Sequence, residues 1–174
     1  MVTAGLLVLR LVLGLLMAAH GAQKLIGWSG APGLSGFAAT LDRLGIRPGR
    51  PWAVVAAAVE LGGGLLVALG LLTQAAALLL AGDLLVAILT VHLVNGFWNR
   101  NGGFEFPLSL LGGFVALSLI GPGPWSIDAV IRLALPQPQT WLGLVIVVLL
   151  GVIAAVAAPR LQSSGPPARP EERA

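Results

Sequence analysis

Charged side chains are scarce in this sequence. Only 10% of its 174 residues are Asp, Glu, Lys or Arg, and 57% are hydrophobic, whereas an ordinary soluble domain is about 25% charged. The mean hydropathy is +0.94. So few charges cannot coat a soluble fold of this size. The composition therefore excludes a soluble globular enzyme and predicts an integral membrane protein in contact with the lipid bilayer.

Cysteine is absent altogether. The chain therefore offers no disulfide, no thiolate metal site and no iron–sulfur ligand, and any redox role would need an electron carrier from outside the chain. Basic residues are also few, because the formal net charge is only +3 despite an isoelectric point near 11.1. They do not cluster into a basic face, so no nucleic-acid partner is predicted.

Long apolar runs are what the sequence does contain. A membrane-spanning helix needs about 20 mostly apolar residues, and five stretches qualify, although the fourth is short. The predicted fold class is an all-α polytopic membrane helix bundle with a four-helix core and an additional fifth span. The predicted spans cover residues 3–23, 52–72, 74–95, 106–121 and 141–158.

These spans divide the chain into four parts. Residues 1–121 form the predicted four-helix membrane core, 122–140 an external loop rich in Pro and Gly, 141–158 the additional span, and 159–174 a polar, Pro-rich cytoplasmic tail expected to be disordered. Because Arg10 interrupts the first apolar run, an uncleaved span is favoured over a signal peptide.

The first loop is long enough to hold a helix of its own. Leu34, Phe37, Ala38, Leu41 and Leu44 recur at helical spacing. This pattern predicts a short amphipathic helix on the membrane surface. A plain connecting helix that packs on the bundle explains the pattern equally well.

Basic residues outside the spans predict the orientation of the chain. With five spans, all but one fall on the same side of the membrane, and Arg132 is the exception. We therefore expect the N-terminus outside and the C-terminus in the cytoplasm, in a plasma (inner) membrane. The residues on the predicted cytoplasmic side are Lys24, Arg43, Arg47, Arg50, Arg100, Arg160, Arg169 and Arg173.

Three charged residues, Arg10, Glu60 and Asp83, fall within the predicted spans. Each costs about 2.5–3.5 kcal/mol at the centre of a bilayer. Helical rise places Arg10 roughly 10 Å and Asp83 roughly 13 Å from the outer side, and Glu60 roughly 12 Å from the cytoplasmic side. We predict a buried polar cluster in which Arg10 is neutralised by Glu60, Asp83 or both. A structural ion-pair cluster and a functional proton or ligand site remain equally good interpretations.

A second polar layer is expected at the cytoplasmic end of the bundle. His20 and His92 lie at similar depths in two parallel spans, with Trp28 and Trp98 as flanking interfacial aromatics. No residues have the fixed spacing of a metal site, so we predict no bound metal and assign no catalytic residue. The candidate site at this mouth consists of His20, Gln23, Lys24, His92, Asn95 and Glu105.

Small residues four apart indicate close helix packing. Such pairs are Gly14 with Ala18, Gly64 with Ala68, and Gly112 with Ala116. Packing within one bundle explains them, and a homo-oligomer is the less specific alternative.

Several short motifs follow one another over about residues 5–120. They are Arg10-x-x-x-Gly14, His20-Gly21-Ala22-Gln23-Lys24-Leu25, Leu44-Gly45-Ile46, Glu60-Leu61-Gly62-Gly63-Gly64, Gly70-Leu71-Leu72-Thr73, Val91-His92, Asn95-Gly96-Phe97-Trp98 and Gly102-Gly103-Phe104-Glu105. Each motif is short, but the ordered set is fairly specific. With these motifs in this order, the sequence resembles the DoxX family of small bacterial membrane proteins. The fifth span and the tail lie outside the resemblance, and Asp83 is not a hallmark of it.

The resemblance implies a core of four membrane helices and a redox association, because the family is named for a subunit of a thiosulfate:quinone oxidoreductase. We expect a membrane redox subunit that interacts with a quinone or anchors a soluble oxidoreductase. His20, His92 and Glu105 would then take up protons, and Lys24 would attract an anion or a quinone oxygen. A non-enzymatic scaffold or assembly factor is the alternative, and a small-solute transporter is a third possibility.

Overall fold

The computed structural model describes residues 1–133 and 135–162, and side chains as far as residue 157. All the regular secondary structure in these residues is helical, which confirms the all-α class. The α-helices are α1 (Val2–Ile26), α2 (Gly33–Arg43), α3 (Gly49–Ala58), α4 (Gly64–Leu69), α5 (Thr73–Ala87), α6 (Glu105–Ile120), α7 (Ile127–Val130) and α8 (Gln139–Gln162).

Four helical stretches are long and apolar enough to cross a membrane. They are Val2–Ile26, Gly49–Leu69, Thr73–Asn95 and Gln139–Ala157. α6 is apolar but has only 16 residues, or about 24 Å of helix. These five helices match the five predicted spans to within a few residues. The molecule is a membrane helix bundle.

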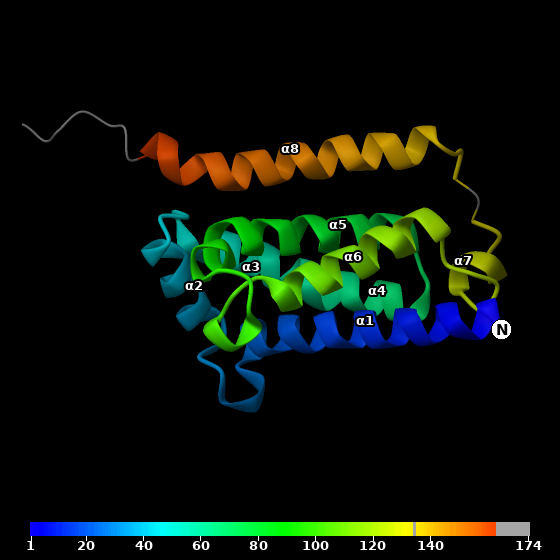
Figure 1. The fold of residues 1–174 in the computed structure, drawn as a ribbon, viewed down its shortest axis with the longest axis horizontal. Helices are drawn as coiled ribbons and strands as arrows, with labels where there is room; N and C mark the ends of the chain where they lie inside the picture. The colour runs from blue at the N-terminus through cyan, green and yellow to red at the C-terminus, as the bar shows by residue number, and fades with distance from the viewer. Residues whose placement is uncertain (134, 163–174) are drawn as a thin grey trace, which may run out of the picture.

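The spans alternate in direction along the bundle. The N-terminus lies at one end, together with α7, and α8 ends at the opposite end, near α2 (Figure 1). We call these the Met1 end and the α2 end. Met1 and the end of α8 thus lie at opposite ends of the bundle, as five crossings require. Which side faces the cytoplasm remains a prediction from the charge distribution.

Glycine lets α1 and α4 approach closely. A Cβ atom added to Gly14 would lie 2.5 Å from the Gly64 carbonyl oxygen, and one added to Gly64 would lie 2.5 Å from the Ala18 nitrogen. Two of the small-residue pairs therefore pack against each other inside one bundle, as predicted. Gly112 takes no part in such packing, because a Cβ atom there would meet nothing within 4 Å.

The predicted amphipathic helix in the first loop is present as α2. Its apolar side packs on α3, where Ala38 and Leu41 are buried with Ile46 and Ala53, and Phe37 lies against them. α2 is therefore packed on the bundle through its apolar face.

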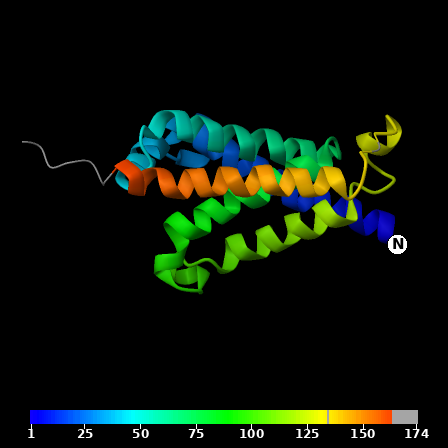
Figure 2. The same ribbon diagram turned by 90° about the horizontal axis from the view of Figure 1, so that it is seen from above.

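α8 lies beside the four-helix core and contacts it mainly through α5 (Figure 2). Only 6% of its spanning window is buried, against 28–39% for the other three spans. α8 comes close to α5 at Gly82, where an added Cβ atom would lie 2.5 Å from Val148 Cγ1. α8 continues to Gln162, four residues beyond the predicted end of the span. The rest of the predicted tail, 163–174, lies outside the described residues.

Candidate functional site

Arg10 is buried at the Met1 end of the bundle, with 1% of its surface exposed. Its Nη1 donates a hydrogen bond to the Pro122 carbonyl oxygen at 3.0 Å, and its Nη2 donates one to the Trp125 carbonyl oxygen. The acidic residue with which it interacts electrostatically is Asp128. The segment after α6 therefore folds back over the bundle and binds this guanidinium through two backbone carbonyl oxygens.

Gly70 provides the space for that guanidinium. It ends α4 in the left-handed conformation, with φ of 71°, which glycine adopts without strain. A Cβ atom at this position would collide with Arg10 Nη1 and would lie 2.6 Å from the Ser126 Cβ. Both the backbone conformation and the contact with Arg10 therefore require glycine.

Asp128 also caps the start of α5. Its Oδ1 accepts a hydrogen bond from the Leu72 nitrogen at 2.8 Å, and its Oδ2 accepts bonds from the Thr73 nitrogen at 3.0 Å and from Thr73 Oγ1 at 2.9 Å. The first N–H groups of a helix lack partners within the helix, and a buried unpaired donor is costly. The Arg10–Asp128 arrangement is therefore a structural clamp that holds α1, α4, α5 and α7 together.

The predicted cluster of Arg10 with Glu60 and Asp83 is wrong in its pairing. The depth estimates assumed that all spans begin in one plane, whereas α1 extends beyond the end of α4. Arg10 is consequently level with the turn at Gly70. Asp128 lies outside the predicted spans, in the short helix α7 within the predicted external loop 122–140. The Ser126 cap of α7, whose Oγ accepts a hydrogen bond from Ala129 N, signals a helix start in the sequence but not where that helix docks.

Glu60 and Asp83 belong to a second buried group, toward the α2 end. Lys24 Nζ donates a hydrogen bond to Glu60 Oε1 and forms an ion pair with it. Glu60 is 4% exposed, and the Lys24 side chain is 28% exposed and lies 4.7 Å over the ring of Phe37. Asp83 interacts electrostatically with both Glu60 and Lys24. We call Lys24, Glu60 and Asp83 the charged row.

Helix register explains why the two carboxylates meet. A Cβ atom on Gly63 would lie 3.2 Å from the Leu80 Cγ, so these two residues face each other on antiparallel helices. Glu60 lies about one turn before Gly63, and Asp83 lies about one turn after Leu80. The two acids therefore stand at the same level.

Two π-helical stretches lie in the spans that carry the two acids. Val59–Gly63 contains Glu60, and Ile88–His92 contains His92. π-Helical turns are rare and occur frequently at functional sites. Their position next to the charged row marks this part of the bundle as the candidate site.

An apolar cavity of about 330 Å³ adjoins the charged row between α3, α5 and α8. Its walls include Trp52 and Val55 on α3 and Val148 and Val152 on α8. Asp83 is the one ionisable side chain among the residues that line it. Small-molecule sites typically have this character, with apolar walls and a few placed polar groups, and volumes of about 300–1,000 Å³.

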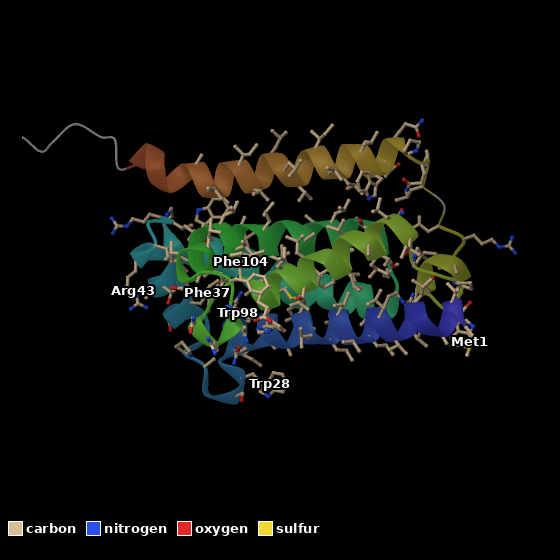
Figure 3. All side chains as sticks on the ribbon, in the orientation of Figure 1. Met1, Trp28, Phe37, Arg43, Trp98 and Phe104 are labelled. Atoms are coloured by element: carbon tan, nitrogen blue, oxygen red, sulfur yellow. The ribbon has the colours of Figure 1, made fainter. Side chains whose placement is uncertain are left out.

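The predicted mouth residues share one end of the bundle but do not form one pocket. His20 and Gln23 line a surface pocket of about 370 Å³ with Trp28 and Ser29, and the ring of His20 lies 6.2 Å from that of Phe106. Trp28, Phe37 and Trp98 all lie at the end opposite Met1 (Figure 3).

The remaining mouth residues shape the loop before α6. His92 Nδ1 lies 2.7 Å from the Gly102 carbonyl oxygen, and Asn95 Nδ2 donates a hydrogen bond to the same oxygen at 3.3 Å. Glu105 Oε2 accepts a hydrogen bond from the Asn99 nitrogen at 2.9 Å. Among the described residues, no group of three or more His, Asp and Glu side chains is placed to hold a metal ion.

Comparison with known proteins gives three relatives. The chain is 35% identical to the uncharacterized membrane protein Rv3486 of Mycobacterium tuberculosis, over 69% of this chain and 77% of the relative. It is 31% identical to the inner membrane protein YqjF of Escherichia coli, over 74% of this chain and 92% of the relative. It is 34% identical to the "Putative oxidoreductase CatD" of Bacillus subtilis, over 71% of this chain and 84% of the relative.

No solved structure matches the chain significantly. The family model named DoxX matches residues 5–93, which contain Arg10 and the whole charged row. The matched region ends before α6 and α8, so the cavity wall formed by α8 lies outside it. From this match and the three relatives, the chain belongs to the DoxX family of membrane proteins.

Proposed function

We propose that this protein is a membrane redox-associated subunit that binds a quinone in the cavity between α3, α5 and α8. The observation that carries the proposal is a single carboxylate, Asp83, in the wall of an otherwise apolar cavity within the membrane. A quinone has an apolar ring and tail and two carbonyl oxygens that accept hydrogen bonds. Apolar walls with one polar group suit such a ligand.

The residues of the cavity fit this group. Its volume of about 330 Å³ falls in the range of small-molecule sites. Little of α8 is buried against the core. A ligand dissolved in the bilayer therefore has a short path to the cavity. When bound, a quinone supplies two-electron, two-proton chemistry, and the protein supplies binding, orientation and charge.

Each residue of the site has a distinct task in this proposal. Asp83 holds or releases a proton next to the ligand oxygen, and Trp52 and Val148 exclude water from the ligand ring. Glu60 and Lys24 keep the carboxylate of Asp83 in position and balance its charge. Electrons come from a soluble oxidoreductase that docks on the membrane, because the sequence contains no cysteine and no cofactor motif. The name of the Bacillus subtilis relative, "Putative oxidoreductase CatD", supports a redox role.

A quinone titration of the protein in lipid nanodiscs tests this assignment. Val148→Trp should fill the cavity and abolish binding, and Asp83→Leu should weaken it by about tenfold through the loss of the hydrogen bond that the protonated Asp83 carboxyl donates to a quinone oxygen. Ile146→Trp is the matched control, because Ile146 is 59% exposed on the same helix and does not line the cavity. Equal quinone binding by Val148→Trp and Ile146→Trp would show that the quinone does not bind in this cavity.

A scaffold or assembly factor is the second candidate, and one observation favours it. His92, Asn95 and Glu105 are all bonded to the backbone of the loop before α6, so they hold a surface in shape instead of pointing into a pocket. If no variant and no wild-type preparation binds quinone, while a stoichiometric partner is lost on His92→Ala, the scaffold replaces the redox subunit.

A further inference from the structure

The charged row crosses the bundle from a water-accessible end to the apolar cavity. Lys24 lies in the last turn of α1 and its side chain is 28% exposed. Glu60 is 4% exposed and bonded to Lys24. Asp83 interacts with both and lines the cavity. The three groups thus connect the water-accessible α2 end of the bundle with the apolar cavity.

An ion pair needs only two of these groups. With both acids ionised, two carboxylates stand against one ammonium group, and the row carries an excess negative charge. An uncompensated charge is costly in an apolar interior. A proton on one of the carboxyl groups removes that excess, so the composition of the row favours an exchangeable proton.

Glu60 has a free acceptor for that proton. Among the residues that the structure describes, only two buried side-chain atoms lack a hydrogen-bond partner, and one of them is Glu60 Oε2. Oε1 of the same carboxylate is bonded to Lys24. One oxygen of Glu60 therefore faces the cation while the other remains available.

No further charged group competes for Asp83 within the described part of the neighbouring helices. The side chains of α8 as far as residue 157 include no ionisable residue. On α6 the ionisable residue is Glu105, which accepts a hydrogen bond from Asn99 N. On α3 it is Arg50, which is exposed. The groups that act on Asp83 are therefore Glu60 and Lys24.

We propose that Lys24, Glu60 and Asp83 form a proton path from the α2 end of the bundle to the cavity. The Lys24 ammonium group gives a proton to the Glu60 carboxylate, and the resulting carboxylic acid passes a proton to the Asp83 carboxylate. The Lys24 amine then takes a proton from water at the α2 end. One proton has moved from water to Asp83, with no change in oxidation state.

From Asp83 the proton passes to a basic oxygen of the ligand in the cavity. The proposal rests on the proposed function only for the identity of that ligand. Its test therefore uses membranes that contain no quinone, so that a failure of the proton path and a failure of quinone binding are separate results.

The experiment uses a carbodiimide on the full-length protein in proteoliposomes of known orientation. Dicyclohexylcarbodiimide is apolar and reacts with protonated carboxyl groups, so it reaches Asp83 from the lipid, and peptide mapping by mass spectrometry locates the adduct. The two sides of the vesicle are held at different pH. Labelling of Asp83 should follow the pH at the α2 end, and should fall by about tenfold for each pH unit once the carboxylate form dominates.

Two variants complete the test. Glu60→Gln keeps the size of the side chain but cannot pass a proton on, so labelling of Asp83 should no longer follow the pH at the α2 end. Thr90→Val removes a polar group from the span that carries Asp83. The Thr90 hydroxyl donates a hydrogen bond to the Val86 carbonyl oxygen, and this variant should behave like the wild type. Absence of an adduct on Asp83, labelling that follows the pH at the Met1 end, or an unchanged response in Glu60→Gln would each overturn the proposal. If Glu60→Gln does not fold, the sided labelling of the wild type decides alone.

Discussion

Replacing Asp128 with alanine is expected to lower the free energy of unfolding by about 3–5 kcal/mol. The substitution removes three hydrogen bonds to Leu72 and Thr73 and leaves buried N–H groups without acceptors. It also removes the acid that interacts electrostatically with Arg10, which is 1% exposed. Reversible unfolding in mixed detergent micelles, followed by circular dichroism, measures the loss.

Substitutions at Thr73 provide the scale for that result. Thr73→Val removes one of the three bonds and should cost about 1 kcal/mol, whereas Thr73→Ser keeps the hydroxyl and should cost less. A loss in Asp128→Ala no larger than that in Thr73→Val would show that the carboxylate does not hold the clamp at the Met1 end.

Lys24→Met is the second substitution with a large expected effect. It should lower the free energy of unfolding by about 2–4 kcal/mol, because removal of one member of a buried pair leaves the other charge unbalanced. We expect less than for a fully buried pair, since Lys24 is 28% exposed and solvent screens part of the interaction. The same unfolding assay in micelles measures it.

A double-mutant cycle separates the pair from the side chain itself. Glu60→Gln in the Lys24→Met background should recover about half or more of the loss, because no ionised Glu60 then remains, and contacting residues typically couple by about 0.5–3 kcal/mol. Arg43→Met is the control, because Arg43 is exposed and bonded to Thr40, and it should change stability by less than about 0.5 kcal/mol. Strictly additive losses would mean that the ion pair contributes nothing.

The fold could be predicted from the sequence because its strongest signal is apolar length. Each span is set by a long, mostly apolar run of residues, and the backbone hydrogen bonds of such a run can be satisfied in the bilayer only within a helix. The amphipathic spacing from Leu34 to Leu44 also predicted α2. This spacing does not show whether the apolar face of α2 lies on lipid or, as observed, on α3.

The site was harder to predict, because pairing depends on how far each helix projects. Residue counting placed Arg10 level with the acids of the neighbouring spans, but the extension of α1 beyond α4 moved it to Gly70 and Asp128. Lys24 had been interpreted as part of the mouth, and its contact with Glu60 follows from the close packing of α1 on this stretch. At Gly21 an added Cβ atom would collide with Leu61. The sequence pattern does not show which helix approaches α1 at this position.

The cavity could not be predicted either. Its walls come from three helices that are distant in sequence, and α8, which covers Gly82 and Asp83, has no charge or motif in its spanning stretch that indicates a partner. Val148 contacts Gly82 because glycine leaves room for it. Only the packing of α8 on α5 shows that Asp83 lines an apolar space between helices.

The most direct test of the proposed function is the location of a bound quinone. An azidoquinone, photoactivated in membranes that contain the wild-type protein and competed with unlabelled quinone, should attach to peptides of α3, α5 and α8 that line the cavity, such as those with Trp52 and Val148. Competed labelling confined to the pocket of His20 and Trp28, or no labelling that quinone competes for, would contradict the assignment of the cavity as the redox site.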